Sequence, residues 1–390
     1  MTEARIRTGL LSGAAFAGMF GFGIVMALLG AILPLVSARL RFDLSQAGNL
    51  FLAMNGAMLV TTVAIGPLLD RFGMKAAFVV APLFVAGAML LVAGTGDFSG
   101  LVLAVVLLGA GGGALNQATN TLIADLHEDP KRKSAALNLL GVFFGFGALF
   151  IPFVIGSLLS ALGLAAILYV GAALSLVPVA AAWLDFPAPR QSEGVPISDV
   201  LRFAREPLVI IFALLLFCES GNEFLLGGYI TTFLTRNLGA SVAAASYLLA
   251  AYWGALMIGR VILSRLLLRA SGGNLVLGSA LAAAASVALL LGAPALPVAG
   301  VAVVLLGFSI AAIFPTTLGL AAAQYPSHSG TVFSILIGVA LSGGMTLPWL
   351  AGQLAGRRGV GAGLTLAIAS ALAIAGFELV SARIVRRQNS

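Results

Sequence analysis

The residues most able to carry chemistry are two glutamates, Glu219 and Glu223, in the middle of a long apolar run that begins near residue 207. In a helix, residues four apart share one face and are separated by one turn. Two carboxylates so close in a medium of low dielectric constant favour protonation of at least one of them. The pair is therefore the candidate site for coupling to a proton or sodium gradient. An alternative is a structural bond from one glutamate to Arg260 or to a helix end.

A second set of polar residues could bind a small solute. Asn116, Gln117 and Asn120 lie in one apolar run, and residues 116 and 120 stack on one helical face. Amides donate and accept hydrogen bonds, which suits a neutral ligand rich in hydroxyls, but they also hold membrane helices together. The remaining candidate contacts with the substrate are Asn222, Tyr229 and Trp349. Aromatic faces pack on sugar rings, although Tyr and Trp also gather at membrane interfaces.

Other kinds of site find little support in the sequence. The single cysteine, Cys218, excludes an intrachain disulfide and a cysteine metal cluster, and His127 and His328 leave little for a histidine metal site. No Ser/His pair or metal cluster stands at membrane depth, so an intramembrane enzyme is not expected. The glycine-rich stretch 109–113 lies inside an apolar run with no lysine after it, which favours close helix packing over a phosphate loop. We therefore expect no cofactor and no metal.

The composition places these residues in a membrane protein. Hydrophobic residues make up 60% of the 390 and charged residues only 9%, and the mean hydropathy is +1.09. Soluble domains carry about 25% charged residues. The 48 glycines suit tight packing of helices in lipid. The net charge of +7 is spread over short loops between apolar runs, so it orients the chain in a bilayer and does not form a nucleic-acid surface.

About twelve apolar runs are long enough to span a membrane, since a spanning helix needs ~20 residues. Their centres fall near residues 23, 56, 84, 112, 146, 173, 216, 254, 282, 306, 340 and 371. The first run is too long for the core of a cleavable signal peptide. The one long polar segment, 185–206, is rich in proline and charge. We expect an all-α fold with an N-terminal six-helix bundle over 1–185, a cytoplasmic linker over 186–206 and a C-terminal six-helix bundle over 207–390.

Orientation follows from the basic residues. With both termini in the cytoplasm, the loops that carry most of the Lys and Arg fall on the cytoplasmic side. We expect a multi-pass monomer in the plasma membrane, here the bacterial inner membrane.

An internal repeat supports the two halves. One glycine, proline, glycine and leucine pattern occurs twice at the same spacing, as Gly147, Pro152, Gly156 and Leu158 and as Gly343, Pro348, Gly352 and Leu354. The Leu-Leu-Gly sequences at 107–109 and 305–307 correspond in the same way. Duplication of a six-helix unit, with a site at the interface of the halves, is typical of secondary transporters.

The loop between the second and third runs reads GPLLDRFGMK over residues 66–75. It resembles the signature G-x-x-x-D-R-x-G-R-[RK] of the major facilitator superfamily, with Met74 where an arginine is usual. The resemblance covers nearly the whole chain and implies that Asp70 and Arg71 act as a conformational latch between the halves. The matching place in the second half retains Arg260 as its counterpart.

A finer resemblance is to the fucose/glucose/galactose symporter branch of that superfamily. The residues shared with the branch are Asn120, Leu137, Asn138, Phe143 and Gly147. The chain departs from it at Asn116 and Phe144, where the branch has an acid and an asparagine, and near Gly30, where an acid is missing. The proton-coupling acids of the branch are thus absent, which leaves that role to Glu219 or Glu223.

The leading hypothesis is gradient-driven uptake of a small polar solute, a sugar or polyol, by proton or sodium symport with alternating access. The alternatives are an efflux antiporter for amphipathic compounds and a membrane sensor that binds a solute without moving it. The high apolar content suits the first alternative, and the sequence alone does not exclude the second.

Overall fold

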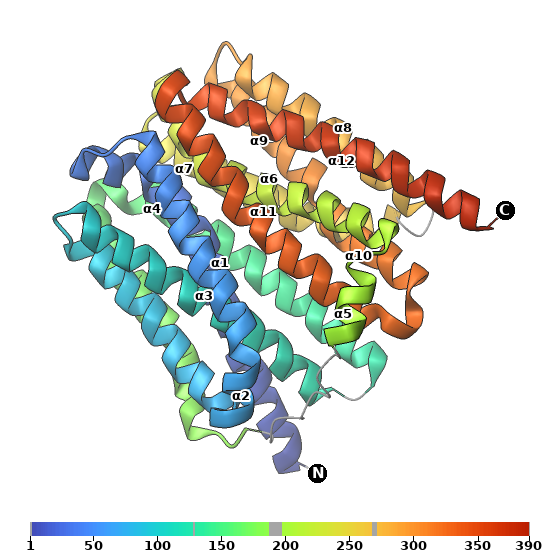
Figure 1. Ribbon diagram of the computed structural model, residues 1–390. Coiled ribbons are helices and arrows are strands. Elements are labelled where there is room, and N and C mark those ends of the chain that lie inside the picture. The colour runs from blue at the N-terminus through green and yellow to red at the C-terminus, as the bar shows by residue number, and fades with distance from the viewer. Residues whose placement is uncertain (1, 128, 187–196, 267–270, 390) are drawn as a thin grey trace. The chain divides into compact units, whose positions relative to one another are not determined.

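The computed structural model describes residues 2–127, 129–186, 197–266 and 271–389, and every regular element in these ranges is a helix (Figure 1). The elements are α1 (Thr2–Leu40), α2 (Leu44–Gly94), α3 (Phe98–Leu126), α4 (Pro130–Ser175), η1 (Val177–Trp183), α5 (Ile197–Phe203), α6 (Pro207–Leu238), α7 (Val242–Leu266), α8 (Gly272–Leu291), α9 (Leu296–Ile310), α10 (Ile313–Gln324), η2 (Pro326–His328), α11 (Ser329–Arg358) and α12 (Val360–Asn389). The fold is therefore all-α, as predicted.

The described residues contain 11 helical segments long and apolar enough to cross a membrane. One of them, Ala135–Trp183, has 49 residues, more than twice the ~20 that one crossing needs. Gly163 divides it, with φ 74° and ψ 164°, and Gly73 divides α2 with φ 78° and ψ 161°. Only glycine adopts this backbone conformation readily, so each glycine ends one helix and begins the next. The prediction of about twelve spanning helices is confirmed.

The chain divides into two compact units. Unit 1 consists of Met1–Phe42, Ala53–Ser192 and Val242–Ala250, and unit 2 of Asp43–Leu52, Glu193–Ser241 and Ala251–Ser390. The start of α2, within 43–52, belongs to unit 2, whereas the rest of α2 belongs to unit 1. The start of α7, 242–250, belongs to unit 1, whereas the rest of α7 belongs to unit 2. The domain limits predicted at 185 and 207 stay a prediction, and residues 187–196 of the predicted linker lie outside the described residues.

Unit 1 is held together by close crossings at glycine. A Cβ at Gly23 of α1 would lie 2.7 Å from the backbone nitrogen of Ala148 and 2.9 Å from the Cα of Gly147, both in α4. A Cβ at Gly109 of α3 would lie 2.8 Å from the carbonyl carbon of Met54 in α2. Backbones that approach so closely leave no room for a side chain, which is a common way of packing helices in lipid.

Unit 2 repeats both crossings at equivalent positions. A Cβ at Gly343 of α11 would lie 2.6 Å from the carbonyl carbon of Phe217 in α6, as at Gly147 against α1. A Cβ at Gly307 of α9 would lie 3.2 Å from the nitrogen of Leu256 in α7, the counterpart of Gly109 against α2. The internal repeat is thus a repeat of helix packing as well as of sequence.

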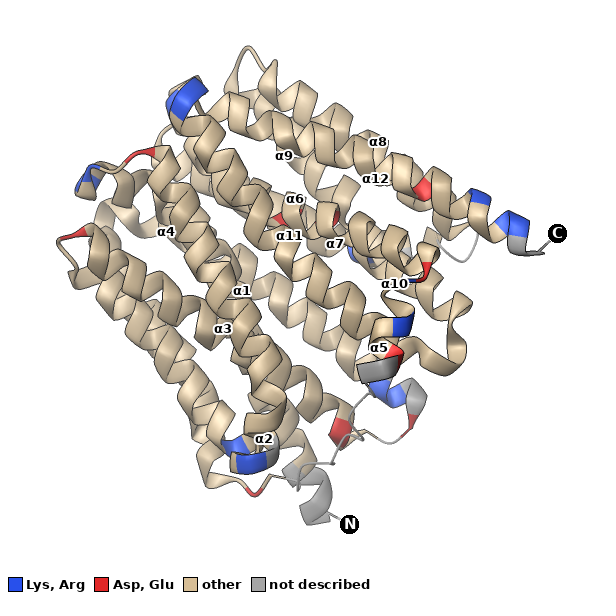
Figure 2. Ribbon diagram, viewed as in Figure 1, with Lys and Arg blue, Asp and Glu red and all other residues tan. Residues whose placement is uncertain are grey.

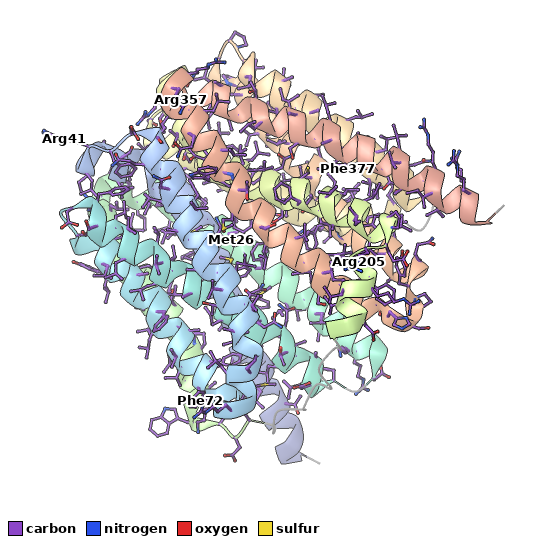
Figure 3. All side chains as sticks on the ribbon, in the orientation of Figure 1. Met26, Arg41, Phe72, Arg205, Arg357 and Phe377 are labelled. Atoms are coloured by element: carbon purple, nitrogen blue, oxygen red, sulfur yellow. The ribbon has the colours of Figure 1, made fainter. Side chains whose placement is uncertain are left out.

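The surfaces of both units suit a lipid environment. Large apolar side chains are exposed at Val63 (72%), Phe72 (60%) and Trp183 (92%), and Figure 3 shows Phe72 projecting away from the ribbon at the turn within α2. Charged residues lie mostly near helix ends and turns, with long uncharged stretches between them (Figure 2). The acidic residues inside α6 are an exception.

Candidate functional site

Helix α6 carries the candidate site and has well-defined ends. Pro207 occupies its first turn, where its fixed φ suits a helix start, and Gly239 caps its C-terminus in the left-handed region at φ 63°. Residues 219–223 stand near its middle, and all five are buried. The sequence thus places two glutamates at the centre of a spanning helix.

Glu223 pairs with Arg260 of α7. The Nη2 atom of Arg260 lies 3.6 Å from Oε2 of Glu223, and the side chains are 33% and 10% exposed. Glu219 is only 1% exposed and interacts electrostatically with both Glu223 and Arg260. Its Oε2 atom has no hydrogen-bond partner among the described residues. The three residues form an ionic cluster, defined here as Glu219, Glu223 and Arg260, within unit 2.

Two further polar side chains border the ionic cluster. Asn222 donates from Nδ2 to the carbonyl oxygen of Ala367 in α12 at 3.3 Å, while its Oδ1 has no partner in the described part of the chain. Tyr252 of α7 is fully buried, interacts electrostatically with all three members of the cluster, and its hydroxyl likewise has no partner in that part. Buried polar atoms are nearly always hydrogen-bonded, so these atoms offer unused bonding capacity beside the ionic cluster to a water, a proton or a ligand.

A break in a spanning helix lies next to the cluster. Helix α9 ends at Ile310 and α10 begins at Ile313, because Pro315 has no N–H to donate to the carbonyl of Ala311. A Cβ at Gly259, the residue before Arg260, would lie 2.8 Å from the Cβ of Ala311. The ionic cluster therefore lies beside a helix with a locally interrupted backbone. The sequence analysis did not identify this break, although Pro315 within an apolar run was its signal.

The predicted amide set of α3 bonds within its own helix. Nδ2 of Asn120 donates to the carbonyl oxygen of Asn116 at 2.8 Å and to its Oδ1 at 3.1 Å. These bonds show that the two residues lie on one face of α3, as predicted. Both residues and Gln117 have intermediate exposure. The role of all three in substrate binding stays a prediction.

The two aromatic residues predicted to contact the substrate, Tyr229 and Trp349, form hydrogen bonds within unit 2. The hydroxyl of Tyr229, a residue only 1% exposed, donates to the carbonyl of Pro348 at 3.2 Å. Nε1 of Trp349 donates to Oδ1 of Asn49 at 3.1 Å, and Nε2 of Gln353 donates to the same oxygen at 3.2 Å. Trp349 and Gln353 thus bind the first turns of α2, a contact that the sequence analysis missed. A substrate role for Tyr229 and Trp349 stays a prediction.

The contacts of the predicted latch residues, Asp70, Arg71 and Arg260, do not test the latch. The guanidinium of Arg71 lies 5.3 Å from the ring centre of Phe72, two residues before the turn at Gly73. The side chain of Asp70 lies outside the described part of the structure. Arg260, predicted as the counterpart in the second half, is paired with Glu223, which was the alternative partner considered from the sequence. The latch itself stays a prediction.

Comparison with known proteins decides the family. The family model described as Major Facilitator Superfamily matches residues 15–348. The chain belongs to the major facilitator superfamily. The resemblance drawn from residues 66–75 is confirmed, and the chain is a membrane transporter and not an enzyme.

One curated relative and several solved structures match this transporter over most of its length. The fosmidomycin resistance protein of Escherichia coli (strain K12) is 23% identical over 350 residues, which is 88% of this chain and 85% of the relative. The nucleoside transporter NupG superposes with a TM-score of 0.79 at 15% identity over 97% of this chain and 99% of its own. A bacterial homolog to the human lysosomal transporter Spinster superposes with a TM-score of 0.77 at 15% identity over 97% of each chain. The E. coli fucose:proton symporter FucP superposes with a TM-score of 0.65 at 18% identity, over 95% of this chain and 98% of its own. At these identities the structures share the fold with this chain, and their substrates differ from one another.

Proposed function

We propose that this transporter moves a small polar solute, a sugar or polyol, together with a proton, and that Glu219 and Glu223 are the coupling carboxylates. The observation that carries the proposal is the ionic cluster, in which two carboxylates are buried in the middle of a spanning helix and one of them pairs with Arg260. Ionisable groups at this depth cost several kcal/mol unless they are paired or neutralised, and they usually serve transport.

The cluster can hold a proton in one state of the transport cycle and release it in another. Two carboxylates close together in a medium of low dielectric constant favour protonation of one of them, while a neighbouring arginine favours the charged form. Small changes in the distance between these carboxylates and Arg260, or in their access to water, therefore shift the equilibrium between the protonated and the ionised carboxylate. A carrier that alternates between two orientations makes such changes in every cycle, and a proton gradient then drives the solute.

The solute class rests on the amides of α3 and on the resemblance of 116–147 to the fucose/glucose/galactose symporter branch. Asn116, Gln117 and Asn120 offer donors and acceptors at membrane depth, and they retain partial exposure. The fucose:proton symporter among the structural neighbours is consistent with this class but shares only the fold. We propose both termini in the cytoplasm of a bacterial cell and a monomer as the working unit.

The test is accumulation of radiolabelled solutes in proteoliposomes. A panel of sugars and polyols is offered under an imposed inward proton gradient, under a sodium gradient, and with no gradient. Accumulation above equilibrium only with the proton gradient supports the proposal. Binding without transport in any condition would identify a sensor, and sodium-dependent accumulation would contradict a proton as the coupling ion.

Export by proton antiport is the second candidate, and one observation favours it. The curated relative, matched over 85% of its length, is named as a resistance protein, which suggests removal of a compound from the cell. The same vesicles distinguish the two directions. Symport accumulates solute when the proton gradient points inward, whereas antiport accumulates the compound when the vesicle interior is the more acidic side.

A further inference from the structure

We infer that the transported proton is held on Oε2 of Glu219 and shared with Oδ1 of Asn222, while Glu223 stays paired with Arg260. This inference rests on the proposed function and deepens it, because it assigns the proton to one of the two carboxylates. It also gives Asn222 the role of a positioning residue for that proton. All four residues belong to unit 2.

Two buried oxygen atoms of α6 have no hydrogen-bond partner in the described chain: Oε2 of Glu219 and Oδ1 of Asn222. Their side chains are 1% and 2% exposed. Residues three apart on a helix are neighbours, with about 5–6 Å between their Cβ atoms. Buried acceptors are nearly always hydrogen-bonded, yet two acceptors cannot bond to each other. A proton on Oε2 turns this atom into a donor, so that one hydrogen bond satisfies both atoms.

The orientation of the Asn222 amide follows from its bond to α12. Its nitrogen, Nδ2, lies 3.3 Å from the carbonyl oxygen of Ala367. A carbonyl oxygen only accepts, so the amide NH2 group has to face Ala367, and Oδ1 faces away from it. The opposite orientation would set two acceptors against each other. The backbone of α12 thus fixes Oδ1 of Asn222 as an acceptor.

The other glutamate of the ionic cluster is bonded differently. Oε2 of Glu223 lies 3.6 Å from Nη2 of Arg260. The charged form of Glu223 therefore has a partner, and a proton on this carboxylate would weaken the ion pair. A proton on Oε2 of Glu219 breaks no hydrogen bond, because that atom makes none in the described part of the chain. The contacts thus favour Glu219 as the carrier of the proton.

Few other titratable groups surround Glu219. Those of α6 and α7 at this level are Cys218, Glu223, Tyr252 and Arg260. Helices α9 and α10, described in full, contain no titratable residue, and α11 contains only the two arginines of its last turn. The acid of α12, Glu378, lies against Gly273 at the start of α8, and the arginines of α12 occupy its last two turns. The two glutamates are therefore the candidate carriers of a proton in the middle of α6.

A sodium ion is the other species that two neighbouring acceptors could bind. Hard cations in proteins are surrounded by about six or more oxygen atoms. The place offers two such acceptors, Oε2 of Glu219 and Oδ1 of Asn222, while Glu223 is occupied by Arg260. A proton needs only two oxygens, so the arrangement favours a proton.

The proton then enters and leaves through one O–H bond. In loading, Oε2 of Glu219 takes a proton from water, and the new O–H group donates to Oδ1 of Asn222. In release, the O–H bond breaks and the proton passes to water on the other side of the membrane. The carboxylate is then left against an acceptor, so it has to turn towards a donor. Arg260 and the hydroxyl of Tyr252, which has no partner in the described chain, both interact electrostatically with Glu219.

The experiment is infrared spectroscopy of the purified full-length transporter in proteoliposomes, recorded over a pH series with no solute and no gradient. A protonated carboxylic acid absorbs apart from carboxylates and amides. We expect such a band at a pH where exposed carboxyl groups are ionised, and we expect Glu219→Gln to remove it. Glu378→Gln is the matched control, because Glu378 is also a buried acid, 4% exposed, and it should leave the band unchanged. Glu223→Asp keeps the charge beside Arg260 and should not move the band.

A second set of variants tests the acceptor. Asn222→Leu keeps a branched side chain without Oδ1, so the band should move to higher frequency and proton binding should weaken about 3–10-fold, as for the loss of one hydrogen bond. Ser370→Ala is the matched control, because it removes another bond from α12 to α6, from Oγ of Ser370 to the carbonyl of Cys218 at 3.0 Å, and leaves the acceptor in place. It should change neither quantity. If Asn222→Leu does not fold, Glu219→Asp replaces it, since the shorter acid draws the O–H group away from Oδ1 and should raise the frequency likewise.

Two results would overturn the inference. A band that survives Glu219→Gln assigns the proton to another residue, and a frequency that changes in neither Asn222→Leu nor Glu219→Asp removes Asn222 as the acceptor. The proposed function fails separately, because the infrared measurement needs no gradient. Proton-driven uptake without the Glu219 band would overturn the inference and leave symport intact. The Glu219 band without accumulation in any gradient would support the inference and contradict secondary active transport.

Discussion

The crossing of α6 and α11 gives the most quantitative prediction, made for Gly343→Ala. The added Cβ would lie 2.6 Å from the carbonyl carbon and 2.8 Å from the Cα of Phe217. These are backbone atoms of a helix, so they do not move aside as the end of a side chain does, and α11 must shift as a body. Overpacking of this kind costs about 1–3 kcal/mol. The shift also acts on α6 two residues from Glu219.

Gly338→Ala is the matched control for this prediction. Gly338 lies on the same helix, and a Cβ there would meet nothing within 4 Å. Both substitutions gain up to about 1 kcal/mol of helix propensity, so the difference between them isolates the crossing. We expect Gly343→Ala to be less stable than Gly338→Ala by about 1–3 kcal/mol in free energy of unfolding, given the overpacking cost.

The assay is unfolding of the purified transporter by sodium dodecyl sulfate in mixed micelles, followed by tryptophan fluorescence. Equal unfolding curves for the two variants would refute the close backbone contact between α6 and α11. Gly147→Ala, at the equivalent crossing of α1 and α4, should behave as Gly343→Ala does, since its Cβ would lie 2.8 Å from the carbonyl carbon of Phe20.

Three further predictions concern the latch, the amides and a helix cap. Asp70→Asn should slow transport while equilibrium solute binding stays within a few fold, measured by uptake rate and by direct binding; loss of binding in a folded protein would place Asp70 in the solute site. Asn120→Ala should weaken solute binding by about 1–3 kcal/mol by loss of a hydrogen bond in a dry site, and unchanged affinity would make the amides of α3 purely structural. Asp97→Ala should destabilise the protein by about 1 kcal/mol, because Oδ1 of Asp97 accepts from the nitrogen of Gly100 at 2.7 Å and caps α3. Chemical unfolding measures the stability of Asp97→Ala, and an unchanged free energy of unfolding would contradict the capping role of Asp97.

The fold could be predicted because the bilayer restricts what a chain can do. Apolar runs of spanning length must be helices, since their backbone groups find no water, and the spacing of Gly147 and Pro152 repeats at Gly343 and Pro348. The central position of Glu219 and Glu223 on α6 followed from the same argument. Their spacing placed both on one face, and their burial is what the structure shows.

Other parts of the site depend on contacts that a single sequence does not specify. Arg260 was assigned to the latch because it stands at the place in the second half that matches the loop 66–75, but its partner depends on the rotation of α7 against α6. The bonds of Trp349 and Gln353 to Asn49 join residues about 300 positions apart. Such pairings arise from tertiary packing, so neither local propensity nor hydrophobic periodicity predicts them.

The central claim is that a carboxylate of α6 couples transport to the proton gradient. The most direct test pairs two measurements on Glu219→Gln and Glu223→Gln: accumulation under an imposed pH gradient, and counterflow of solute without one. Glutamine mimics the protonated acid, and exchange of bound solute needs no proton release. We predict that at least one variant loses accumulation and retains counterflow. Normal accumulation by both variants would show that α6 is not the coupling element.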